Sequence, residues 1–218
     1  MRSARRMITT VIFDLGEVLL NAIRDSGRRL ADEYGINNVT TPEQAVFSYY
    51  GLSHPLLVPA IVDFIHGKIL EDEYITAVLA TYPQLVAVGD LKKYIRDNFS
   101  EVAGTRKIIL RLRQQGFKLG LLSTHAREWI EYCQEKFRFI ELFDQVSFSY
   151  EEGVSKPDPK AYQTILAKLG SAPQECVFID DTPDNVSAAQ AIGMNGIVFT
   201  SAAELDIMLA RLLPNYVT

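Results

Sequence analysis

The sequence has few cysteines, no excess of positive charge and no long apolar run, and each of these shortages excludes a class of protein. Its 218 residues include only two cysteines, Cys133 and Cys176, too few to build a disulfide framework. We expect both to be reduced and packed as small apolar side chains in a cytoplasmic protein. Lys and Arg total 22 against 27 Asp and Glu, a net charge of −5. A nucleic-acid partner is therefore not expected, because phosphate binding needs a basic face.

Membrane insertion is not expected either. A membrane-spanning helix needs about 18 consecutive apolar residues, and the longest candidate, 56–65, is interrupted by Pro59 and Asp63. The basic residues 1–6 are not followed by the apolar region of a secretory signal. The length suits one large domain, or one domain with a smaller insert, and we expect a monomer or a homodimer.

The sequence alternates between short apolar runs and stretches with helical periodicity. Five runs resemble strands that are buried on both faces, as in a parallel sheet: 8–14, 117–123, 145–149, 175–180 and 196–200. Four helices are predicted between or after them: 107–115, 127–139, 159–169 and 185–192. This alternation predicts a doubly wound α/β fold with right-handed βαβ units and a parallel, Rossmann-like sheet.

The segment from Leu19 to Phe99 departs from the alternation. It contains no comparable apolar strand, and helical periodicity runs through it between scattered proline and glycine residues. We interpret residues 19–99 as an all-α insert of about four short helices. The predicted core then comprises residues 7–18 and 100–218.

Polar side chains stand at or just after the ends of the apolar strands. They are Asp14, Ser123, Lys156 and the pair Asp180–Asp181. In an open parallel sheet the carboxyl ends of the strands line the ligand crevice. A single Asp at a strand end is a common turn or capping residue, but two such strands together with a serine and a lysine indicate a functional site.

Four motifs in this order resemble those of the haloacid dehalogenase (HAD) superfamily of phosphohydrolases with an aspartate nucleophile. The motifs are Val11-Ile-Phe-Asp-Leu-Gly-Glu-Val18, Leu119-Gly-Leu-Leu-Ser-Thr124, Lys156-Pro-Asp-Pro159 and Val177-Phe-Ile-Asp-Asp-Thr-Pro-Asp-Asn185. The resemblance spans residues 8–200 and is most similar to the subgroup that includes sugar-1-phosphate phosphatases. It implies that the insert is a helical C1 cap and that the substrate is a small phosphorylated metabolite.

The resemblance also implies roles for individual residues. Asp14 would be the nucleophile, Ser123 and the Thr124 amide would bind phosphate, and Lys156 would orient Asp14 and offset charge. Asp14, Asp180 and Asp181 carry three negative charges against one on Lys156, so a phosphate dianion needs a cation, for which Mg²⁺ is suited. Asp14, the Gly16 carbonyl and Asp181 would bind this ion, and Asp180 would bind it through water.

Structural roles remain open for several of these residues and their neighbours. Ser123 is an alternative cap for the helix near Arg127, and Lys156 an alternative solvated loop residue. Asp184 is expected to be a helix N-terminal charge and Asn185 a partner of the loop that holds Asp181. The other open cases, each with a structural and a substrate-contacting interpretation, are His54, His66, His125, Tyr49, Tyr50, Arg24 and Arg28.

Two positions depart from the superfamily pattern. Most of its phosphatases carry an Asp, which acts as general acid and base, where this chain has Gly16, and Thr124 replaces a common Asn. The absence of that acid favours a leaving group that needs little protonation, such as an anomeric oxygen; Glu17 is an alternative acid–base group. Two other functions stay open: a catalytically impaired binding or regulatory protein, and a metal-independent 2-haloacid dehalogenase.

Overall fold

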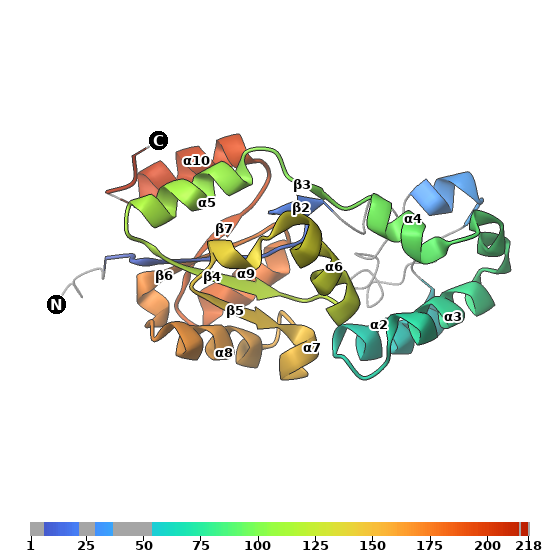
Figure 1. Ribbon diagram of the computed structural model, residues 1–218. Helices are drawn as coiled ribbons and strands as arrows, with labels where there is room; N and C mark the ends of the chain where they lie inside the picture. Colours follow the sequence, from blue (N-terminus) through green and yellow to red (C-terminus); the bar gives the residue numbers. More distant parts are fainter. Residues whose placement is uncertain (1–6, 22–28, 37–53, 214, 218) are drawn as a thin grey trace.

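The structure is a computed structural model that describes residues 7–21, 29–36, 54–213 and 215–217. Five parallel strands form its central sheet in the order β5–β4–β1–β6–β7. Their bounds are β1 Thr10–Phe13, β4 Lys118–Ser123, β5 Gln145–Phe148, β6 Cys176–Asp180 and β7 Asn195–Val198. The predicted doubly wound, parallel α/β sheet is confirmed (Figure 1).

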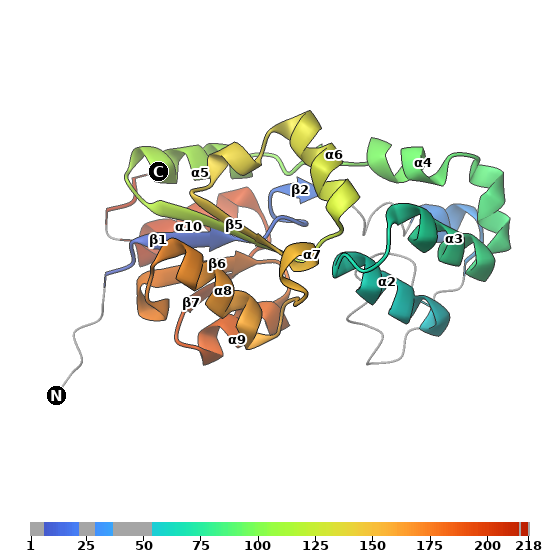
Figure 2. The ribbon, with the colours of Figure 1, turned by 60° about the horizontal axis from the view of Figure 1, so that its bottom comes forward.

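Helices cover both faces of this sheet, which explains why the strands are nearly continuous apolar runs. Val11 and Phe13 belong to the apolar cluster shared with α5 (Thr105–Gln114), α6 (Arg127–Phe137) and α10 (Ala202–Leu212). Ile12 belongs to the opposite cluster, shared with α8 (Pro159–Leu169) and α9 (Pro183–Ala191). Figure 2 shows α5 on one side of the strands, with α8 and α9 on the other.

The predicted elements of the core agree with the observed ones to within two residues at each end. Two helices, α10 and the four-residue α7 (Ser149–Glu152), were not predicted. Cys133 and Cys176 are buried and unpaired, as expected. Among the described residues no helix combines the length and apolar character needed to cross a bilayer.

A group of helices, residues 54–99, lies beside the carboxyl ends of the strands, and we call it the cap (Figure 1). It comprises η2 (Pro55–Leu57), α2 (Val58–Ile65), α3 (Glu71–Thr81), η3 (Pro83–Val88) and α4 (Leu91–Asp97). Its apolar residues form one continuous cluster with the α5, α6 and α10 face of the core.

The expectation that residues 19–99 hold only helices is wrong at the start of the segment. Leu20–Asn21 form a short strand, β2, that pairs antiparallel with β3 (Ser100–Glu101). This two-stranded ribbon joins core and cap on both the outgoing and the returning chain. Two residues per strand are too few to produce an alternating pattern, so the sequence contains no signal for it.

Candidate active site

Asp14 follows β1, the central strand of the sheet, and the residue is almost fully buried, with 5% of its surface exposed. The backbone N–H of Asp14 donates to the Ile179 carbonyl at 2.8 Å. Asp14 Oδ1 accepts from the backbone N–H of Leu15 at 2.7 Å. These bonds hold the carboxylate where the strands end, which is where an open parallel sheet binds ligands.

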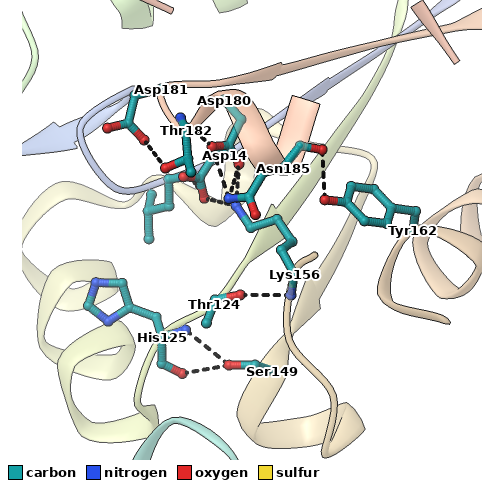
Figure 3. Close-up of polar contacts among 11 residues, drawn as sticks. Asp14, Thr124, His125, Ser149, Lys156, Tyr162, Asp180, Asp181, Thr182 and Asn185 are labelled. Carbon is teal, nitrogen blue, oxygen red and sulfur yellow. Dashed lines mark hydrogen bonds and ion pairs between the residues drawn. The ribbon is translucent and has the colours of Figure 1, made fainter. Parts of the chain in front are cut away.

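Lys156 joins Asp14 to the end of the neighbouring strand β6. Its Nζ lies 2.6 Å from Asp14 Oδ1 and 2.6 Å from Asp180 Oδ2, and the side chain is buried (Figure 3). Burial lowers the pKa of Lys156, but the adjacent Asp14 and Asp180 outweigh burial and hold the pKa above its usual value. Lys156 therefore stays charged, and the alternative of a solvated loop lysine is wrong.

Asp180 and Asp181 are adjacent in sequence but have different surroundings. Asp180 is fully buried and accepts from Lys156 Nζ, from the Thr182 backbone N–H at 2.8 Å and from Asn185 Nδ2 at 3.1 Å. Asp181 is only half-buried and accepts from the Thr182 hydroxyl at 3.4 Å. Asn185 thus bonds the Asp180 carboxylate itself, and Asp184 lies in the first turn of α9, as predicted.

The chemistry of this carboxylate cluster suits a divalent cation. Asp14, Asp180 and Asp181 each offer an oxygen, and these oxygens all lie within 4.8 Å of one another. Burial raises the pKa of Asp14 to about 8; Lys156 opposes the shift, while Asp180 and Asp181 add to it. A cation among these oxygens would relieve their mutual repulsion, and hard oxygen donors beside a phosphate site are typical of Mg²⁺.

The expected phosphate-binding residues lie at the end of β4, where Ser123 is the last residue of the strand, and in the loop that follows it. Ser123 Oγ is buried and has no hydrogen-bond partner among the described residues. Its proposed alternative role as a helix cap is wrong, because α6 begins after Ala126 without a side-chain cap. Thr124 Oγ1 accepts from the Lys156 backbone N–H at 3.2 Å, which ties this loop to the lysine loop. A buried, unpartnered hydroxyl is costly unless a ligand completes its bonding.

Gly16, the position at which the superfamily pattern is broken, faces open space. A Cβ built on Gly16 meets no atom within 4 Å. The next residue, Glu17, adopts a left-handed backbone with φ 57°, which is unusual for a residue with a side chain. Steric crowding therefore does not explain why the chain has no carboxylate at position 16.

His125 is not the surface residue that one interpretation of the sequence suggested. It is 5% exposed, and its ring lies edge-on to Trp129, with the centroids 5.7 Å apart. Burial, with a smaller contribution from Lys156, lowers the pKa of His125 to about 4. In Figure 3 its ring lies on the side away from Lys156. The sequence placed His125 in the right loop but contained no sign of its burial.

The histidines of the cap have local partners. His66 Nε2 lies 3.2 Å from Ser155 Oγ, next to Lys156, so the cap reaches the lysine loop. His54 Nδ1 accepts from the Leu56 backbone N–H at 3.2 Å, a structural role at the start of η2. The candidates Arg24, Arg28, Tyr49 and Tyr50 lie outside the described residues.

Comparison with known proteins identifies the class. The model of the haloacid dehalogenase-like hydrolase family matches residues 8–193. The chain belongs to this family of hydrolases, and the resemblance drawn from the four motifs is confirmed.

Individual relatives are similar over different shares of their length. The flavin mononucleotide hydrolase 1 of Arabidopsis thaliana is 30% identical over 53% of this chain, which spans about half (46%) of that protein. The sesquiterpene phosphatase astK of Aspergillus oryzae is 28% identical over 93% of this chain and 95% of its own. A HAD family enzyme of Bacteroides thetaiotaomicron, solved with magnesium and inorganic phosphate, superposes with a TM-score of 0.68 at 19% identity, over 89% of this chain and 95% of that one.

Proposed function

We propose that the protein is a magnesium-dependent phosphohydrolase that removes phosphate from a small metabolite through an aspartyl-phosphate on Asp14. The observation that carries this proposal is the buried contact of Asp14 with Lys156, beside the oxygens of Asp180 and Asp181. Relatives named as phosphatases and as a flavin mononucleotide hydrolase support phosphate esters as the substrate class. Their differing names do not favour one metabolite.

In the first half-reaction, a carboxylate oxygen of Asp14 forms a bond to phosphorus. The bond between phosphorus and the ester oxygen breaks, and that oxygen leaves with the electron pair and takes a proton from solvent. Asp14 Oδ1 accepts the bonds from Leu15 and Lys156, which fix the plane of the carboxylate. Lys156, charged and buried, offsets the negative charge on the transferring phosphoryl group.

In the second half-reaction, water attacks the phosphorus of the acyl phosphate. The bond between phosphorus and the Asp14 oxygen breaks, the carboxylate is regenerated, and the proton of the water passes to solvent with inorganic phosphate. Ser123 Oγ is buried and has no partner in the part of the chain that the structure describes, and we assign it, together with the Thr124 backbone N–H, to a phosphate oxygen.

Asp14, the Gly16 carbonyl and Asp181 would hold the magnesium ion, with Asp180 in an outer position. When bound, Mg²⁺ neutralises charge on the phosphate and so allows the dianion to approach Asp14. Asp180 fits an outer role because the described residues engage both of its oxygens.

The missing acid at position 16 favours a substrate with a good leaving group, such as a sugar phosphorylated at its anomeric oxygen. Protonation contributes less to the departure of such a group than to that of an ordinary alcohol. The remainder of the substrate would face the cap, which meets the lysine loop through His66 and Ser155.

Substitution of the nucleophile tests this proposal. We expect Asp14→Asn to lose more than nine-tenths of the kcat for p-nitrophenyl phosphate with Mg²⁺, because an amide is a poor nucleophile and carries no charge for the metal. The matched control is Asp184→Asn, an exposed acid in the same part of the molecule, which should keep wild-type activity. An Asp14→Asn protein that folds and retains a tenth or more of kcat would exclude the covalent mechanism.

A further inference from the structure

The only tryptophan of the sequence, Trp129, lies where the cap meets the core. Its indole Nε1–H donates to Glu71 Oε1 at 2.8 Å, and both side chains are almost completely buried. Trp129 belongs to the core helix α6, whereas Glu71 is the first residue of the cap helix α3. A buried hydrogen bond to a carboxylate thus crosses the junction between the two parts.

The charge on Glu71 is balanced within the cap. Arg96 of α4 donates to Glu71 Oε2, and Lys92 Nζ lies 3.9 Å from the same oxygen. In return, the Glu71 backbone N–H donates to Glu128 Oε1 of α6 at 3.0 Å. Two adjacent residues of α6 therefore form hydrogen bonds with Glu71: Glu128 accepts from its backbone N–H, and Trp129 donates to its carboxylate. Together these bonds fix the position of α3 on α6.

Trp129 also contacts the loop that follows β4. Its ring lies edge-on to His125, with the centroids 5.7 Å apart at an interplanar angle of 82°. On the cap side, Trp129 meets Phe64 at 4.8 Å and Tyr74 at 5.9 Å between centroids. His125 directly follows Ser123 and Thr124, so the ring of Trp129 connects the cap to the residues assigned to phosphate.

A second connection reaches the same loop from the other end of the cap. The His125 backbone N–H donates to Ser149 Oγ at 3.0 Å, and Ser149 Oγ donates to the Ile65 carbonyl at 2.6 Å. Ile65 ends α2 of the cap, and Ser149 follows strand β5. Figure 3 shows both bonds of Ser149 to His125 beneath the aspartate and lysine cluster. The cap thus reaches the ring of His125 through Trp129 and the backbone of His125 through Ser149.

We propose that Glu71 is a positioning residue that seats the cap on α6 and, through Trp129 and His125, sets the loop that binds phosphate. The inference rests on the proposed function for the role of Ser123 and Thr124. It predicts that displacement of the cap weakens phosphate binding more than it raises the Mg²⁺ requirement, because the contacts named above lead to the loop of Ser123 and Thr124 rather than directly to the carboxylates of Asp14 and Asp181. Trp129 emission then reports whether the cap is seated.

The closing experiment compares Glu71→Gln with Glu73→Gln. Glu73 lies on the same helix, but it is exposed and bonds the Leu70 backbone N–H. Inorganic phosphate is titrated calorimetrically at saturating Mg²⁺, and the Mg²⁺ requirement for p-nitrophenyl phosphate hydrolysis is measured in parallel. We expect Glu71→Gln to weaken phosphate binding about tenfold, with the Mg²⁺ requirement within twofold of wild type, and Glu73→Gln to change neither. A merely structural role would lower stability but would not weaken phosphate binding while leaving the Mg²⁺ requirement unchanged.

Two further measurements keep the inference open to refutation if Glu71→Gln does not fold. Trp129→Phe keeps the aromatic packing but removes the indole N–H, and it should weaken phosphate binding to the same extent. In the wild type, phosphate with Mg²⁺ should change the emission of Trp129. Unchanged phosphate affinity in a folded variant, or unchanged wild-type emission on phosphate binding, overturns the inference. A wild type that binds phosphate but hydrolyses no ester contradicts the proposed function instead.

Discussion

Asp180 and Asp181 are adjacent carboxylates with different surroundings, and we expect different roles for them. Asp180 points into the protein, where a lysine, an amide side chain and a backbone N–H engage its two oxygens. Asp181, one residue further along, is half-buried. A carboxylate whose lone pairs are already used by donors is a poor direct ligand, so we propose an outer position for Asp180 and keep Asp181 as the proposed direct ligand.

Magnesium titration of activity separates these roles. We expect Asp180→Asn to raise the Mg²⁺ concentration for half-maximal activity about tenfold, the lower end of the effect of outer-shell partners. Asp181→Asn should raise it at least about tenfold more, because a direct ligand and its charge are lost. If Asp180→Asn has the larger effect, Asp180 rather than Asp181 binds the ion directly.

Gly16 leads to a prediction about the rate-limiting step. Hydrolysis of an aspartyl-phosphate needs a base whatever the substrate was, and a general base contributes about 10²–10⁴-fold. We therefore expect a stoichiometric burst of p-nitrophenol before a slow steady state. We also expect kcat to be similar across esters with good leaving groups. A linear time course from the first turnover, with kcat falling as the leaving-group pKa rises, would point to Glu17 or a cap residue as the missing base.

The open space around Gly16 allows the converse experiment. Because a Cβ at this position meets no atom within 4 Å, Gly16→Asp should be accommodated and should raise the steady-state rate by about tenfold or more, a fraction of the full effect of a well-placed base. Gly16→Asn has the same shape without a base and is the matched control. An equal rate in both variants would show that a carboxylate at this position does not assist water.

At the scale of elements, α5 and α10 are joined by a polar network near the C-terminus. Arg111 of α5 lies 2.6 Å from Asp206 Oδ1 of α10, and it also donates to Tyr216 Oη at 3.0 Å. Tyr216 Oη in turn donates to Asp206 Oδ1. Burial raises the pKa of Asp206, but the bonds from Tyr216 and Arg111 outweigh burial, and the pKa is lowered overall.

The lowered pKa of Asp206 predicts the sign of a stability effect. The network stabilises the fold above the unfolded pKa of about 3.8, and its contribution is lost as the pH falls through the lower pKa of the folded state. Asp206→Asn should therefore reduce the free energy of unfolding by up to about 1 kcal/mol at pH 7, a typical value for a partly exposed pair. Urea unfolding at pH 7 and pH 3 measures this, and a difference that persists undiminished at pH 3 contradicts the assignment.

At the scale of the molecule, the cap and core form one structure because a single apolar cluster runs through both. His125 lies at their junction, where burial holds its pKa near 4, below the ordinary 6.5. Between these two pH values the unfolded chain binds a proton that the folded chain excludes. The folded protein therefore loses stability as the pH falls across that interval.

His125→Leu isolates this contribution, because leucine keeps an apolar side chain at the junction but does not titrate. Relative to the variant, the wild type should lose up to about 3 kcal/mol of unfolding free energy between pH 7 and pH 4. Chemical unfolding at pH 7, 5 and 4 gives the free energy of unfolding of both proteins. Asp14 contributes a pH dependence of the opposite sign, but it is present in both proteins and cancels in the difference between them. If the free energy of unfolding changes equally with pH in both proteins, His125 becomes protonated in the folded state.

Local patterns in the sequence predict the α/β alternation, the helical segment, the positions of Asp14, Ser123 and Asp180 at strand ends, and that of Lys156 in a loop beyond β5. Continuous apolar runs require burial on both faces, and the residues that follow such runs meet at one edge of a parallel sheet. The family assignment rests on the same four motifs. The roles of these residues in binding and catalysis stay predictions.

Contacts between residues far apart in the chain are decided only by the tertiary structure. The burial of His125, the bond of Trp129 to Glu71 and the choice of Asp180 as the partner of Lys156 depend on which helices pack together. The β2–β3 ribbon joins strands that are about eighty residues apart, and each strand has only two residues. Periodicity describes how one segment repeats along its own axis, whereas these features arise where segments with independent patterns meet.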